Sequence, residues 1–258
     1  MNVNYTSNEA VVKEITEGVN EITVTSNGSV GIFAVVGEAF PQVKATSYVR
    51  DPQGRVVINP ANGNPVQGPI KNLGKTTPDY IVGLTSTFRW KALSLSTTFD
   101  YRTGHVYYEQ GSDAMEFTGR SIESVSSNRQ DFVVPNSVIE TSPGVFVENT
   151  NIPVTGGRQD YWTNTYNNIK ENYIKDATAF KMREIAFMYE LPRTLLQNRP
   201  ISSLRFGLVG RNLITVLPSE NRFSDPEFNN TNSNAVGIGG YFQSPPTRSI
   251  GFNINIEF

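Results

Sequence analysis

The sequence predicts an all-β protein whose antiparallel strands form a segment of a transmembrane β-barrel with long extracellular loops. Three observations predict it: segments in which apolar and polar residues alternate, segment lengths close to that of a membrane-crossing strand, and connections that are alternately short and long. The composition agrees, because the 258 residues are 11% aromatic and only 18% charged, with many Gly and Pro. Such a composition favours strands and turns over helices.

The final strand, predicted over 247–258, shows the alternation most strictly. Two sets of residues alternate along it: Ile250, Phe252, Ile254, Ile256 and Phe258 on one face, and Ser249, Gly251, Asn253, Asn255 and Glu257 on the other. Successive side chains of a strand point to opposite faces, so one face is apolar and the other polar. The segment also has the length of about 9–11 residues with which a tilted strand crosses a bilayer.

The same pattern predicts four more strands, at roughly 79–90, 92–102, 177–191 and 203–213. The first two are separated by a two-residue turn and form a hairpin, and the last two flank a short connection. Aromatic residues near strand ends fit the girdles of an outer-membrane barrel. Residues 2–5 are a candidate for one further, partial strand.

One strand departs from strict alternation. Lys181 and Arg183 fall on the same side of the pattern as Ile185, which predicts a β-bulge or a strand end that reaches past the apolar zone.

Two connections are long, at roughly 103–176 and 214–245, and they are rich in Asn, Ser, Gly and Pro. Loops of this length are abnormal for soluble sandwiches, whereas outer-membrane barrels alternate short turns with long outer loops. Aromatic rings in these connections lie among residues with amide and hydroxyl groups. Such rings could stack on sugars or extended peptides, or they could pack the loops against one another. Five aromatic residues are candidate ligand contacts on this ground: Tyr107, Tyr108, Tyr161, Trp162 and Tyr241.

Composition also excludes several classes of function. The formal net charge is −2, which does not mark a nucleic-acid binder. The chain has no cysteine and a single histidine, His105, so thiolate metal sites, cysteine nucleophiles and two-histidine metal sites within this chain are excluded. No run of about 18 apolar residues predicts a membrane-spanning helix, and the first residues do not form a signal peptide. No catalytic, cofactor-binding or metal-binding residue is nominated.

Two groups of carboxylates keep alternative interpretations. The segment Asp225-Pro226-Glu227 could hold Ca²⁺, or it could be a loop fixed by proline and Asx turns, and it lacks the glycine of an EF-hand loop. A glycosidase would need a pair of carboxylates, for which chance proximity in polar loops is the simpler account. The residues in question are Asp100, Glu109, Asp113, Glu116 and Asp131.

A series of short motifs resembles the C-terminal region of the SusC/RagA family of TonB-dependent outer-membrane transporters of Bacteroidetes. The motifs stand in the family's order and cover the chain from about residue 49 to its end. They are Val49–Val57, Leu73–Tyr80, Tyr173–Pro192 with its Lys181-Met182-Arg183-Glu184, Gly210–Leu213, Asp225–Glu227 and Pro245–Asn253. Departures, such as Lys75-Thr76 after Leu73-Gly74, concern single loops.

The resemblance implies a 22-stranded barrel, to which this chain would contribute about five to six strands, with the plug domain and TonB box absent from it. It implies a place in the bacterial outer membrane and a role in the import of glycans or peptides, without enzyme activity or cofactors. The implied partners are a SusD-like surface lipoprotein, the TonB complex acting through the missing N-terminal region, membrane lipid and the substrate, with no nucleic acid. The final Phe258 resembles the signal that barrel-assembly machinery reads.

A second hypothesis does not involve a membrane. The chain could be a soluble, β-rich carbohydrate-binding module that uses the loop aromatics, in which case its apolar strand faces should bury against each other.

Overall fold

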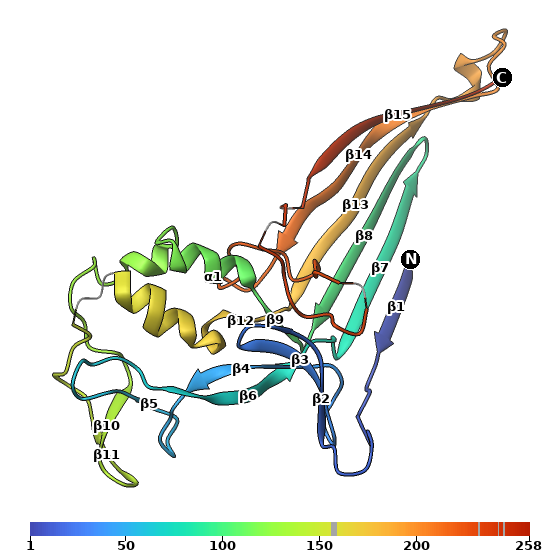
Figure 1. Cartoon of the computed structure of the whole chain (residues 1–258). Helices are drawn as coiled ribbons and strands as arrows, with labels where there is room; N and C mark the ends of the chain where they lie inside the picture. The colour runs from blue at the N-terminus through green and yellow to red at the C-terminus, as the bar shows by residue number, and fades with distance from the viewer. Residues whose placement is uncertain (156–158, 232, 242, 245) are drawn as a thin grey trace.

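The computed structural model describes residues 1–155, 159–231, 233–241, 243–244 and 246–258, and Pro245 of the last motif lies outside these ranges. The chain is mostly β. Figure 1 shows a long, curved sheet and, at one end of it, a broader assembly of short strands and helices. We call this assembly the cap; the described residues of the segments 8–79, 104–178 and 217–248 form it. No helix in the described ranges is long and apolar enough to cross a bilayer.

Six strands form the long sheet in the order β1-β7-β8-β13-β14-β15, and every neighbouring pair is antiparallel. They are β1 (Asn2–Ser7), β7 (Tyr80–Trp90), β8 (Leu93–Thr103), β13 (Ala179–Glu190), β14 (Ser203–Val216) and β15 (Ser249–Glu257). Each strand pairs with the sheet strand that follows it along the chain, so the sheet is an up-and-down meander. The partial strand suggested at residues 2–5 is β1, which pairs with β7.

A β-bulge at Arg183 explains the irregular alternation in β13. The register shifts between Met182 and Glu184 against both neighbouring strands. One extra residue reverses the parity of all that follows. Ile185 therefore joins the apolar face that carries Met182, while Lys181 stays on the polar face.

One face of the long sheet is apolar across all six strands, and nothing in the described part of the chain covers it. Its exposed large side chains are Val3, Tyr5, Phe88, Trp90, Leu95, Phe180, Phe187, Phe206, Leu208, Ile214, Val216, Ile250, Phe252, Ile254 and Ile256. The other face, which we call the inner face, carries Ser, Thr and charged residues. In the described part of the chain, β1 and β15 each pair on one side only, so the sheet is open at both edges.

The cap contains more regular structure than its polar sequence indicates. A four-stranded sheet in the order β2-β3-β4-β6 precedes the hairpin, a three-stranded sheet in the order β11-β10-β5 lies farther out, and β9 pairs with β12. The strands are β2 (Glu21–Asn27), β3 (Val30–Val35), β4 (Gln42–Tyr48), β5 (Val56–Val57), β6 (Gln67–Lys75), β9 (Val106–Tyr108), β10 (Ser137–Ser142), β11 (Val145–Glu148) and β12 (Ile174–Asp176). The helical elements are α1 (Gln110–Phe117), a π-helical turn (Tyr161–Tyr166) and 3₁₀ turns at Ile122–Val125 and Lys170–Tyr173. A further 3₁₀ turn, Arg193–Leu195, lies in the short connection between β13 and β14.

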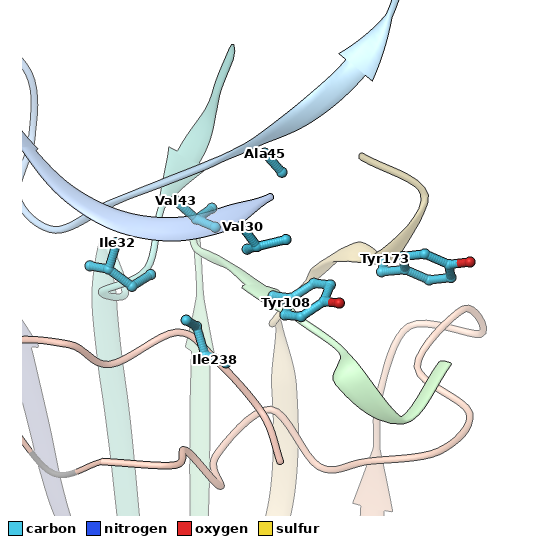
Figure 2. Close-up of a cluster of buried hydrophobic side chains, with 7 residues drawn as sticks. All are labelled: Val30, Ile32, Val43, Ala45, Tyr108, Tyr173 and Ile238. Atoms are coloured by element: carbon cyan, nitrogen blue, oxygen red, sulfur yellow. The ribbon is translucent and has the colours of Figure 1, made fainter. Parts of the chain in front are cut away.

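The core of the cap draws together segments that are far apart in the sequence. Figure 2 shows its side chains, which come from β3, β4, β9, the turn before β12 and the segment after β14. They are Val30, Ile32, Val43, Ala45, Tyr108, Tyr173 and Ile238. Burial of this apolar surface is the main term that holds the three cap segments together.

Candidate functional site

A buried ion pair fastens the segment after β14 to the inner face of the sheet. Nζ of Lys181 lies 2.7 Å from Oδ1 and 2.5 Å from Oδ2 of Asp225. It also lies 2.7 Å from Oε2 of Glu227. The side chains of Lys181 and Asp225 are only 4% and 2% exposed. A charge so buried is tolerated only when it is paired, so this contact fixes where the segment lies.

Glu227 extends the pair into a charge network. Its two carboxylate oxygens accept hydrogen bonds from both Nη atoms of Arg183, at 2.7 and 2.6 Å, in the forked geometry that arginine favours. Arg102 lies 3.1 Å from the same carboxylate, and Asp100 accepts from both Arg183 and Arg102 at 3.0 Å. Burial alone would raise the pKa of Glu227, but the hydrogen bonds from Arg183 and Lys181 lower this pKa to about 2.

In this structure the carboxylates of Asp225 and Glu227 are paired with cationic side chains of the same chain. Their oxygens are bound by ammonium and guanidinium groups, and Asp225 Oδ1 also accepts from the backbone N–H of Glu227 at 3.0 Å, an Asx turn. Within the described ranges no cluster of three His, Cys, Asp or Glu side chains is placed to hold a metal ion. The segment is thus built to bind cationic side chains of its own chain.

A second buried carboxylate anchors the same segment to the cap. Glu109, fully buried before α1, accepts hydrogen bonds from the backbone N–H groups of Phe223 and Ser224 at 3.2 and 2.9 Å, and from the hydroxyl of Tyr107 at 3.0 Å. Asp113, also buried, accepts from Nζ of Lys170 at 2.7 Å. Of the five carboxylates considered for a glycosidase pair, Glu109, Asp113 and Asp100 therefore have partners within the chain.

The single histidine is also structural. His105 is nearly buried at the junction of β8 and β9, and burial, with the nearby Arg102, lowers its pKa to about 4. Its Nδ1 has no hydrogen-bond partner in the described part of the chain. The side chain is therefore an enclosed, neutral imidazole.

The five nominated aromatic residues do not surround one cavity. Tyr107, Tyr108, Tyr161 and Trp162 are buried, and only Tyr241 is well exposed, at 49%. Tyr108 packs edge-on against a core tyrosine, whereas Tyr161 and Trp162 meet edge-to-face at 5.2 Å between ring centroids in a separate cluster. Loop packing, the alternative interpretation, describes the surroundings of Tyr107, Tyr108 and Tyr161, whereas Trp162 also borders a cavity.

Two cavities of ligand size lie in the cap. One, of about 500 Å³, has amide side chains and the ring of Tyr241 among its described lining residues, which are Gln110, Asn229, Asn230, Gly240, Tyr241 and Gln243. The other, of about 640 Å³, lies between the end of α1 and the π-helical turn and is mostly apolar; Trp162 forms part of its wall. Both volumes fall in the usual range of small-molecule sites.

The sequence did not reveal the charge network, although it contained a signal for it. Two cations, Lys181 and Arg183, interrupt the alternation of a membrane-length strand, and two carboxylates, Asp225 and Glu227, stand in a Pro-containing turn. Nothing local connects them, because 44 residues separate Lys181 from Asp225.

Comparisons with known proteins agree with this architecture. No family profile matches the chain. A curated relative, TonB-dependent receptor P3 of Formosa agariphila, is 24% identical over 234 residues, which is 86% of this chain and 21% of the relative. The chain is similar to part of a TonB-dependent receptor. The resemblance inferred from the sequence motifs is thereby confirmed, and so is the predicted place in the bacterial outer membrane, where such receptors lie.

Solved structures share the fold of this chain. The RagAB peptide transporter matches 99% of this chain with a TM-score of 0.66 and 16% identity, over 27% of its own chain. The RagAB peptide importer in its open-open state matches 99% of this chain with a TM-score of 0.64 and 16% identity, over 26% of its own chain. The receptor-like chain described here thus spans about a fifth of its curated relative and about a quarter of these structures.

Proposed function

We propose that this chain forms wall and outer loops of a barrel that imports glycans or peptides across the bacterial outer membrane, and that it performs no covalent chemistry. One observation carries the proposal: the long sheet has an apolar face that is exposed over six strands and an inner face that is polar and charged. Ile250 and Phe252, for example, are 78% and 63% exposed. Water disfavours an apolar face of this extent, whereas lipid would cover it.

The connections give the proposed orientation. The three long ones, β1 to β7, β8 to β13 and β14 to β15, all belong to the cap, at one end of the sheet, while the short turns after β7 and β13 lie at the other end (Figure 1). Outer-membrane barrels place short turns in the periplasm and long loops outside. We therefore assign the cap, with the predicted loops 103–176 and 214–245, to the outer surface.

The open edges of the sheet are the places where further barrel strands would pair. Six strands are too few to close a membrane barrel, for which about eight is the smallest number. In the proposed assembly, β1 and β15 pair with strands of the larger barrel, 22-stranded by the family resemblance. A plug and the TonB complex would act from outside this chain.

The amide-lined cavity beside Tyr241 is the proposed contact for substrate. Amide groups both donate and accept hydrogen bonds, which suits sugar hydroxyls and peptide backbones alike, and the exposed ring offers a stacking surface. We propose that Tyr107, Tyr108 and Tyr161 support the cap from its interior, whereas Trp162 borders the second cavity. A surface lipoprotein that covers the cap is the proposed partner, on the family resemblance and the two-component name of the RagAB structures.

The soluble-module hypothesis receives less support. It requires the apolar strand faces to bury against one another, and the apolar face of the long sheet meets no second sheet in the described part of the chain.

Membrane fractionation tests the proposal. The chain should be expressed with an export signal and its native C-terminus, and membranes should be washed with urea before extraction with and without detergent. We expect recovery only with detergent, or in aggregates when partner strands are lacking. A soluble monomer that melts cooperatively without detergent would contradict the proposal and favour the binding module.

A further inference from the structure

The larger cavity of the cap has a lining that matches one class of ligand. Phe117, the last residue of α1, and Trp162 supply aromatic wall, and Thr163 and Gln159 supply polar groups. Among the described residues of the lining, Arg129 is the charged one. Phe117 is half exposed, so the cavity opens to solvent.

The guanidinium of Arg129 is available for an anion. Within the described ranges Arg129 forms no ion pair, whereas the arginines of the inner face, Arg102 and Arg183, are each held by carboxylates. An unpaired guanidinium beside an apolar wall favours a carboxylate bound in forked geometry.

The backbone that carries Arg129 is unusual. Asn128 and Arg129 both adopt left-handed conformations, with φ of 51° and 58°. Residues other than glycine rarely adopt this conformation, and two in succession hold the arginine at the edge of the cavity at a conformational cost. Strain of this kind is concentrated at ligand-binding positions.

We propose that this cavity binds the C-terminal residue of a peptide that ends in a large apolar side chain. The side chain packs against Phe117 and Trp162, and the free α-carboxylate binds Arg129. Gln159 and Thr163 then face the last peptide group. A sugar fits less well, because hydroxyl groups surround its ring and this wall is mostly apolar. The inference rests on the proposed import function, since it names one class of cargo.

The chain offers a direct optical test, because its only two tryptophans are Trp90 and Trp162. In a Trp90→Phe background, Trp162 is the remaining tryptophan, so the tryptophan fluorescence of the complete chain in detergent reports on the cavity. The probes are acetyl-Ala-Ala-Phe with a free carboxylate, the same peptide as its C-terminal amide, and the neutral sugar cellohexaose. The reverse background, Trp162→Phe, should show no response to any probe.

We expect the free acid to change Trp162 emission and to bind at least about tenfold more tightly than the amide, as a charge-assisted hydrogen bond implies. Arg129→Gln should remove this difference. The matched control is Arg120→Gln, which changes an exposed arginine close by that does not line the cavity. It should leave both affinities within about twofold. Far-UV circular dichroism of each variant verifies the fold, and the comparison of acid with amide needs no substitution in the cavity.

Several outcomes would overturn the inference: equal binding of acid and amide, a difference that survives Arg129→Gln, or a response to cellohexaose in place of the peptide. Calorimetry on the same samples distinguishes a failure of the cavity inference from a failure of the proposed import function. Peptide binding without a Trp162 response would reject the cavity and leave the importer standing, whereas recovery of a soluble monomer in the fractionation experiment would reject the importer itself.

Discussion

Nζ of Lys181 on β13 lies within 2.7 Å of both carboxylate oxygens of Asp225, a residue of the cap segment that follows β14. The contact joins the proposed membrane-spanning part of the chain to its proposed outer part. Because both side chains are almost completely buried, neither charge could be left alone without a large penalty. The position of the segment over the inner face therefore depends on this pair and on the neighbouring Glu227.

Removing Lys181 should release the segment. In Lys181→Met the carboxylate of Asp225 would remain buried without its main partner, at a cost on the order of 3–5 kcal/mol. We expect faster protease cleavage between β14 and β15, measured by mass spectrometry on the complete chain in detergent. The matched control is Arg211→Gln, which breaks the exposed pair with Glu184, and it should cost less than about 1 kcal/mol. Equal cleavage in the two variants would contradict the anchoring role.

The charge network should lose strength in acid. The pKa of Glu227 is lowered to about 2 from an ordinary value of 4.5, so the folded state favours its ionised form. Its stabilising contribution is complete above about pH 4.5 and disappears as the pH falls toward 2. Thermal unfolding between pH 6 and pH 3 should show a decrease in melting temperature that is smaller in Glu227→Gln. Parallel curves for the two proteins would show that Glu227 does not carry this dependence.

The pH dependence of stability that Glu116 contributes should have the opposite sign to that of Glu227. Burial raises the pKa of this carboxyl on α1 to about 7 from 4.5, and its Oε2 has no hydrogen-bond partner in the described part of the chain. The folded state therefore favours the protonated form, and stability decreases as the pH rises from about 4.5 to 7. Glu116→Gln, which stays neutral, should stabilise the chain at pH 8 by on the order of 2 kcal/mol. A chemical denaturation series at pH 5 and pH 8 measures this gain, and a variant less stable at pH 8 would refute the assignment.

The apolar face should tolerate no charge if lipid covers it. Phe252→Arg places a guanidinium in the middle of β15, at a cost of roughly 2–4 kcal/mol in a bilayer. Asn253→Arg, one residue along on the polar face, should cost much less. The fraction of chain that stays in urea-washed membranes measures the difference. Similar retention of the two variants would argue against a lipid-facing surface.

Substitutions at Tyr241 and Tyr161 should distinguish a residue that contacts ligand from one that only packs in the cap. Tyr241→Ala removes an exposed ring from the amide-lined cavity and should weaken binding of peptide or oligosaccharide about tenfold, with a melting temperature close to that of the parent chain. Tyr161→Ala removes a buried ring and should destabilise the cap by about 3–5 kcal/mol. Calorimetric titration and thermal unfolding of both variants test the assignment. Unchanged affinity in Tyr241→Ala would exclude the cavity as the substrate contact.

The sequence by itself predicted five strands of the long sheet and their two faces, with residues 2–5 as a partial sixth. The alternation that ends at Phe258 requires one apolar and one polar face, because the side chains of a strand alternate regardless of what surrounds it. The irregular parity at Lys181 and Arg183 left a bulge and a strand end as alternatives, and the register of β13 shows the bulge. The motifs indicated the resemblance to TonB-dependent transporters, which the comparisons with known proteins then confirmed.

Only the tertiary structure decided what lies against these faces. The partner of Lys181 stands 44 residues away, and no local pattern selects Asp225 from the other carboxylates of the loops. Tyr107 and Tyr108 are neighbours in the sequence, yet one is buried against Glu109 and the other in the core beside Tyr173, because β9 is covered on both sides. Local spacing specifies which side of a strand is apolar, whereas burial and charge pairing depend on the segments that long-range folding brings to it.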